Sequence, residues 1–165
     1  MPKHHDQSVA EHSFFVGLYA LHIADILEMD AIARFDILHA GLLHDAEEVW
    51  SGDTPSPYSK FMDIPLYVKK RLQKMLAPFN YDVYIAHYSD IIKLADLIEA
   101  YHWIKEEENM GNKNLKLMRI EIWTKINNAI KNLNCTVEQE ALICDLARAN
   151  VKVEPPYAKH MVAEG

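Results

Sequence analysis

Apolar residues recur every three or four positions along most of the chain, in segments separated by short polar breaks. This period is typical of amphipathic helices and not of the alternation of strands. Glycine and two prolines in SGDTPSP, residues 51–57, predict a loop, and Gly111 and Asn112 predict another break. We therefore expect an all-α, compact helical bundle with about six main helices, near residues 9–28, 31–49, 65–78, 89–108, 115–133 and 137–150.

Three of these segments begin with residues that cap helices. Ser8 is followed three positions later by Glu11, and Thr136 is followed by Gln139 in the same way. In such capping boxes the hydroxyl accepts from the backbone N–H at the third helical position, and the longer side chain accepts from the backbone of the cap. Asp30 is a suitable cap for the second helix.

Composition narrows the class of protein. The chain has 165 residues and half of them are hydrophobic, so we expect one folded domain over residues 1–150 and a tail over 151–165. A net charge of −7 argues against binding a nucleic-acid polymer. Cys135 and Cys144 form no CxxC pair, and no apolar run has membrane-spanning length. These features predict a cytoplasmic protein with no membrane partner.

Four polar residues interrupt faces that otherwise have the pattern of a core: His12, His44, Asp45 and Asp96. A carboxylate in such a place is costly unless it is paired or binds a cation. Imidazoles and carboxylates together are suitable ligands for one divalent metal ion, with positions left for water and substrate. Because the four residues come from three predicted helices, a bundle could hold them around one site.

Other interpretations of the same residues stay open at this point. Asp96 could be a buried ion-pair partner of Lys93 or Arg34, and a single histidine on a helix is more often structural than a ligand. Four other histidines fit the structural role, namely His22, His39, His87 and His102.

Three strings resemble one known family. SVAEHS (residues 8–13), LLHDAEEVWSGDTPSP (42–57) and IKLADLIEA (92–100) are similar to motifs of the HD-domain metal phosphohydrolases, in particular the 5′-deoxynucleotidase branch. That branch includes small phage enzymes that hydrolyse deoxynucleoside triphosphates. The resemblance covers about residues 4–110 and implies an HD-domain bundle. It also implies the metal ligands, which are His12, His44, Asp45 and Asp96.

The resemblance further implies two catalytic acids, Glu48 and Asp53. If the second helix continues to residue 49, Glu48 shares a face with His44 and Asp45, because residues three and four apart lie together. Glu47 would then point away as a solvated charge. For substrate binding, the candidates are Lys93 and Lys60 near phosphate, and Trp50 and Pro57 beside the base.

The implied reaction is hydrolysis of the O5′–Pα phosphoester of a deoxynucleotide, assisted by one divalent metal ion. Mn²⁺ or Co²⁺ is favoured, with Zn²⁺ or Mg²⁺ as alternatives. The short chain favours a dNTP triphosphohydrolase, with dATP as one candidate substrate, over a 5′-deoxynucleotidase that acts on dNMPs. A non-catalytic HD module that binds nucleotides is the alternative of another class. The family implies a homo-oligomer, a dimer or hexamer.

One departure from the family lies near the start of the chain. Related enzymes carry an Arg-Trp pair about fifteen residues before the histidine of the first helix, whereas only eleven residues precede His12 here. That pair helps to hold phosphate and to reject the ribose 2′-hydroxyl. Selectivity for deoxyribose is therefore the part of the resemblance with the least support in this sequence.

Overall fold

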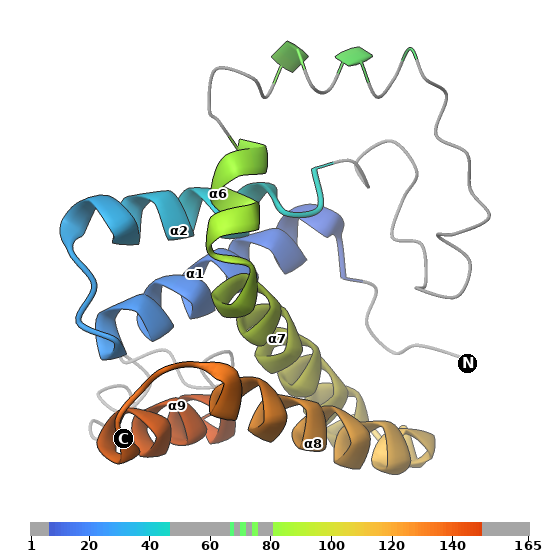
Figure 1. Ribbon diagram of the computed structural model, residues 1–165. Helices are drawn as coiled ribbons and strands as arrows, with labels where there is room; N and C mark the ends of the chain where they lie inside the picture. Colours follow the sequence, from blue (N-terminus) through green and yellow to red (C-terminus); the bar gives the residue numbers. More distant parts are fainter. Residues whose placement is uncertain (1–6, 47–66, 68–69, 72–73, 76–80, 150–165) are drawn as a thin grey trace, which may run out of the picture.

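A computed structural model describes residues 7–46, 67, 70–71, 74–75 and 81–149. All regular elements within these ranges are helical, which confirms the predicted all-α fold (Figure 1). No described helix combines the length and the apolar character that crossing a bilayer requires. The elements are α1 (Val9–Ile26), α2 (Ala31–Leu43), α6 (Tyr81–His87), α7 (Ser89–Asn109), the short 3₁₀ helix η2 (Lys113–Leu115), α8 (Lys116–Asn132) and α9 (Val137–Arg148).

The predicted caps begin the helices as expected. Ser8 Oγ accepts a hydrogen bond from the backbone N–H of Glu11 at 3.1 Å at the start of α1. Asp30 Oδ1 accepts from two backbone N–H groups, both at 2.9 Å, at the start of α2. Thr136 and Gln139 form a complete capping box at the start of α9. These bonds satisfy N–H groups that have no partner within the helix.

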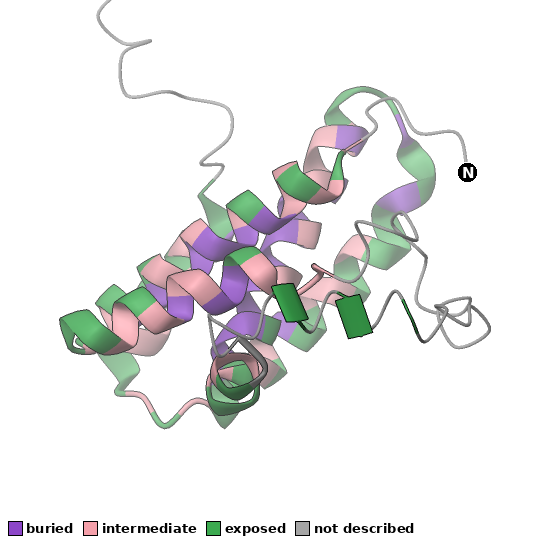
Figure 2. Cartoon of the chain, turned by 90° about the horizontal axis from the view of Figure 1, so that it is seen from above, coloured by how far each residue is buried: buried purple, intermediate pink, exposed green. Residues whose placement is uncertain are grey.

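Helix α7 is the central element of the bundle. It packs against α1 on one side and α8 on the other, while α2 lies along α1 and α9 closes the lower part in Figure 1. Figure 2 shows buried positions concentrated where these helices meet. The fully buried large side chains include Tyr19, Ile23, Ile37, Leu94, Ile98, Ile104, Ile126, Ile130 and Ile143.

Helices α1 and α2 approach closely because glycines face each other. A Cβ placed on Gly41 would lie 2.8 Å from the Cα of Gly17, which is closer than side-chain carbon atoms pack. A Cβ on Gly17 would lie 3.1 Å from side-chain atoms of Leu42. The contact of backbone against backbone brings the N-terminal part of α1 next to the C-terminal end of α2.

A buried histidine, His102, forms polar contacts that link α1, α7 and α9. His102 on α7 has no exposed surface, and its Nε2–H donates to the carbonyl of Ala147 on α9 at 2.8 Å. Its Nδ1 contacts the hydroxyl of Tyr19 on α1. Because a carbonyl can only accept, the neutral ring carries its proton on Nε2, and Nδ1 then accepts from the hydroxyl. This agrees with the structural role predicted for His102.

Some predicted boundaries are wrong. Helix α2 ends at Leu43 instead of continuing to about residue 49, and residues 44–46 form a turn closed by a bond from the N–H of Ala46 to the carbonyl of Leu43 at 3.0 Å. Helix α6 was not predicted. The break at Gly111 occurs as expected, with a φ of 104° that favours glycine. The loop at 51–57, most of the predicted helix 65–78 and the tail at 151–165 lie outside the described residues.

Candidate metal centre

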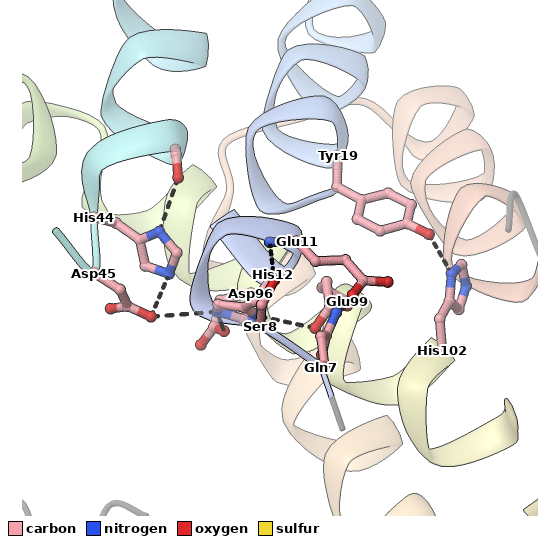
Figure 3. Close-up of polar contacts among 11 residues, drawn as sticks. Gln7, Ser8, Glu11, His12, Tyr19, His44, Asp45, Asp96, Glu99 and His102 are labelled. Atoms are coloured by element: carbon pink, nitrogen blue, oxygen red, sulfur yellow. Dashed lines mark hydrogen bonds and ion pairs between the residues drawn. The ribbon is translucent and has the colours of Figure 1, made fainter. Parts of the chain in front are cut away.

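Four side chains from three helical segments converge at one end of the α1–α2 pair (Figure 3). Nε2 of His12, one turn into α1, lies 3.3 Å from Asp45 Oδ2 and 3.4 Å from Asp96 Oδ1 on α7. Nε2 of His44 lies 3.0 Å from the same Asp45 oxygen. Ligand atoms of His12, His44 and Asp96 all lie within 4.8 Å of one another. The structure therefore brings together all four residues predicted to bind a metal.

Both imidazoles are held through their Nδ1 atoms, which leaves Nε2 facing the shared centre. His12 Nδ1 lies 2.9 Å from Glu99 Oε2, and His44 Nδ1 lies 2.8 Å from the carbonyl oxygen of Gly41. An ionised carboxylate and a carbonyl are acceptors only, so each Nδ1 carries a hydrogen. In the neutral rings the lone pair is therefore on Nε2, the atom next to Asp45 and Asp96.

One buried atom of the centre supports a bound cation. Among the described residues, His44 Nε2 is buried without a hydrogen-bond partner, although Asp45 Oδ2 is only 3.0 Å away. A buried polar atom without a partner is costly and calls for a specific explanation. Two imidazole nitrogens and two carboxylates are ligands that Zn²⁺, Mn²⁺ and Co²⁺ accept. The residues present thus fit a divalent metal ion.

The acids and bases of the centre alter one another's ionisation. Burial alone would lower the pKa of His12, but hydrogen bonds to Asp45 and Glu99 raise this pKa to about 10. Burial likewise opposes the charge on Asp45, yet the adjacent imidazoles of His12 and His44 hold the pKa of Asp45 well below its usual range. The pKa of Asp96 is raised, chiefly by burial. Without a cation, protonated His12 supplies positive charge next to these carboxylates.

Glu99 is a residue of the site that sequence reasoning missed. It lies on α7 one turn after Asp96 and is only 1% exposed. Its Oε1 accepts a hydrogen bond from Nε2 of Gln7 at 2.7 Å, and its Oε2 contacts His12 (Figure 3). A second carboxylate directly after the apolar stretch of residues 91–98, three positions beyond Asp96, was the signal available in the sequence.

The remaining predictions for the site have mixed outcomes. The alternative in which Asp96 pairs with Arg34 is not favoured, because Arg34 Nη1 binds Asp25 Oδ1 at 2.5 Å and Asp96 contacts His12. Lys93 is exposed on α7, one turn before Asp96. The helical spacing argument for Glu48 depends on a longer α2, and α2 ends at Leu43. The predicted residues that lie outside the described ranges are Glu48, Trp50, Asp53, Pro57 and Lys60.

Comparisons with known proteins agree with this geometry. Residues 1–63 match the model of a family described as 5′-deoxynucleotidase YfbR-like. Among solved structures, the cyanophage S-2L HD phosphohydrolase DatZ, bound to dA and one catalytic Zn²⁺ ion, matches with a TM-score of 0.60 and 18% sequence identity. The match covers 88% of this chain and 84% of that chain. No curated protein sequence matches the chain.

The two comparisons bear on different parts of the chain. The family model covers the segment with three of the four converging residues, His12, His44 and Asp45. The structural match extends over most of the chain, and at this identity it shows a shared fold. The family match agrees with the resemblance of the first part of the chain to 5′-deoxynucleotidases, and the structural match agrees with the expected fold.

Proposed function

We propose that this HD-type protein hydrolyses the O5′–Pα bond of deoxynucleotides and that it acts as a dNTP triphosphohydrolase. The observation that carries the proposal is the convergence of His12, His44, Asp45 and Asp96, with both Nε2 atoms facing the two carboxylates. Ionisable groups gathered at a partly buried site add little to the stability of helix packing, so their convergence supports a functional role.

The four converging side chains are the proposed ligands of one divalent metal ion. When bound, this ion supplies positive charge to a phosphate oxygen and lowers the pKa of a water molecule. The structural neighbour holds a catalytic Zn²⁺, which supports testing Zn²⁺ beside the Mn²⁺ and Co²⁺ that the sequence resemblance favours. Asp45 and Asp96 would contribute carboxylate oxygens as ligands, and the imidazoles would contribute their Nε2 lone pairs.

Hydrolysis forms a bond from a water oxygen to Pα and breaks the bond from Pα to O5′. One proton must leave the water and one must reach O5′, which is the work of a general acid–base group. Glu48 is the proposed group, and Asp53 is the proposed second acid beside it. Lys93, exposed on α7 one turn before Asp96, is proposed to balance phosphate charge. Lys60 is proposed to do the same, with Trp50 and Pro57 beside the base.

Triphosphate and monophosphate substrates share the same reacting bond and differ in the leaving product. The dA-bound phage neighbour supports a deoxyadenosine nucleotide as the first substrate to test. The YfbR-like family match supports a 5′-deoxynucleotidase that acts on dNMPs as the second candidate. A triphosphohydrolase releases deoxynucleoside and inorganic triphosphate, whereas a monophosphatase releases deoxynucleoside and phosphate.

The experiment is a product assay with dATP, other dNTPs, dNMPs and rNTPs in the presence of Zn²⁺, Mn²⁺ or Co²⁺. We expect deoxynucleoside and triphosphate from dATP, and loss of turnover when a chelator is added. Glu48→Ala should keep the metal and lose turnover by about 10²- to 10⁴-fold, the usual contribution of a general acid–base group. Glu47→Ala is the matched control and should retain activity.

Three outcomes would contradict the proposal in different ways. Phosphate release from dNMPs alone would replace the triphosphohydrolase with the nucleotidase. Nucleotide binding by metal-loaded protein without turnover of any nucleotide would favour the non-catalytic HD module. Loss of metal in Glu48→Ala would make Glu48 a ligand and remove its assigned role in proton transfer.

A further inference from the structure

We propose that Glu99 is a positioning residue of the metal centre, which fixes the imidazole of His12 with Nε2 toward the metal. The inference rests on the metal site of the proposed function and adds a residue that the predicted ligand set does not contain. Glu99 lies behind His12, on the side of the ring opposite Asp45 and Asp96 (Figure 3).

The geometry gives Glu99 little freedom. Its side chain is 2% exposed, its Oε2 accepts from His12 Nδ1–H at 2.9 Å, and its Oε1 accepts from Gln7 Nε2 at 2.7 Å. Both carboxylate oxygens are thus engaged by donors from the N-terminal part of the chain. A buried carboxylate is tolerated only when such partners compensate its lost hydration.

The arrangement has a defined chemical effect on His12. The acceptor at Nδ1 fixes the tautomer, so that Nε2 offers a lone pair to a metal, and a negatively charged acceptor makes the ring a stronger ligand. His44 is held by a neutral carbonyl instead. The charge behind His12 therefore distinguishes the two imidazoles and also offsets the positive charge of a bound cation.

Helix α7 contributes to both sides of the same imidazole. Asp96 and Glu99 are three residues apart, so their side chains lie on one face of the helix, about one turn from each other. Asp96 Oδ1 lies 3.4 Å from Nε2 of His12, and Glu99 Oε2 lies 2.9 Å from Nδ1. One turn of α7 thus places the proposed ligand Asp96 at the Nε2 side of the ring and the positioning residue Glu99 at the Nδ1 side.

The test compares Zn²⁺ affinity in Glu99→Gln and Glu99→Leu with the wild-type chain, by competition against a chromophoric chelator. Glutamine keeps an acceptor but removes the charge, and leucine removes both. The matched control is Glu107→Gln, because Glu107 is equally buried on α7 but binds Asn112 at 3.1 Å, away from the centre. Circular dichroism and thermal melting check that each variant folds, and Glu99→Gln decides the question if the leucine variant does not fold.

We expect Zn²⁺ affinity to fall by about 10- to 100-fold in Glu99→Gln, the usual effect of removing a group that orients a metal ligand. It should fall further in Glu99→Leu and stay within about threefold of wild type in Glu107→Gln. In ¹⁵N NMR spectra of the Zn²⁺-loaded wild type, His12 should show a protonated Nδ1 and a metal-bound Nε2. In Glu99→Leu this signature should be weakened or lost.

The outcomes separate this inference from the proposed function. Unchanged affinity in both Glu99 variants, or an equal loss in Glu107→Gln, would overturn the positioning role while the metal centre stands. Loss of all Zn²⁺ binding in Glu99→Gln would make Glu99 itself a ligand, which also overturns it. If the wild-type chain bound no divalent metal, both the proposed metal centre and this inference would fall.

Discussion

The carboxylate of Asp45 lies between the two imidazoles of the centre and contacts both, at 3.3 Å from His12 and 3.0 Å from His44. A carboxylate at these distances favours the protonated form of an imidazole, which explains why the pKa values of both histidines are raised despite burial. A metal ion that binds to Nε2 competes with those protons. Protonation and metal binding are therefore mutually exclusive at the same atoms.

The metal affinity should depend steeply on pH. The pKa of His12 is raised to about 10, so at pH 7 its folded, metal-free form is protonated and must release a proton when a metal binds. Zn²⁺ affinity should rise by about tenfold per pH unit for each displaced proton as the pH increases towards 10. Chelator competition between pH 6 and 9, corrected for the chelator's own protonation, measures this. A pH-independent affinity would contradict the charge state assigned to His12.

At the residue scale, the sequence was sufficient to identify the four converging side chains but not Glu99. His12, His44, Asp45 and Asp96 interrupt apolar faces and also match a family pattern, and each of these signals is local. The role of Glu99 depends on a contact with His12, 87 residues earlier in the chain. Its position next to an apolar stretch marks it as a buried acid, but Glu107 is buried on the same helix as well, so burial alone does not reveal the contact with His12.

The close crossing of α1 and α2 sets the distance between His12 and His44. Gly17 and Gly41 meet there backbone to backbone, and Gly41 lies three residues before His44. The Gly41 carbonyl also accepts the hydrogen bond from His44 Nδ1 at 2.8 Å. The helix contact and the orientation of one imidazole thus depend on the same residue.

Gly41→Ala should weaken both the fold and the metal centre. The new Cβ would lie 2.8 Å from a backbone atom of Gly17, so the helices must separate. Overpacking of this kind costs about 1–3 kcal/mol of unfolding free energy, partly offset by the higher helix propensity of alanine, about 1 kcal/mol. Because His44 moves with α2, we also expect Zn²⁺ affinity to fall at least about tenfold. Denaturant unfolding and Zn²⁺ titration measure the two effects.

Gly17→Ala is the matched control for the same crossing. Its Cβ would lie 3.1 Å from Leu42 side-chain atoms, which can turn away, so the loss of stability should be smaller. If Gly17→Ala were as damaging as Gly41→Ala, or if neither changed the affinity, the close approach would not control the spacing of the histidines.

At the element scale, the starts of helices were more predictable than their ends. Ser8, Asp30 and Thr136 cap helices as predicted, because a cap depends on residues within one turn. The end of α2 was misjudged, because residues 44–49 contain good helix formers and no glycine or proline marks the stop. In the structure, Asp45 lies in the turn after Leu43 and contacts His12 on α1, a tertiary contact that local propensity does not report.

For the whole molecule, a bound metal should stabilise the native state. Any ligand that binds only the folded protein adds about 2.7 kcal/mol at one hundred times its Kd. For a chain of this length each kcal/mol raises the melting temperature by about 2–4 °C, so we expect an increase of about 5–11 °C with Zn²⁺. Thermal melting with and without Zn²⁺ measures this shift, and a chelator should reverse it. In Asp96→Asn, Zn²⁺ should raise the melting temperature by less than in the wild type. An equal increase in that variant would exclude Asp96 as a ligand.

Because α7 provides both Asp96 and Glu99, the centre cannot be transferred with the N-terminal segment alone. A chain cut after residue 46 would keep three donors, His12, His44 and Asp45, yet lose the carboxylate from α7 and the acceptor behind His12. Asp96 lies 51 residues after Asp45, so the site is completed by a part of the chain far beyond the familiar histidine–aspartate string. If N-terminal segments are exchanged between related proteins, the histidine–aspartate motif should be kept, but the complete metal centre should be kept only if α7 is exchanged together with that segment.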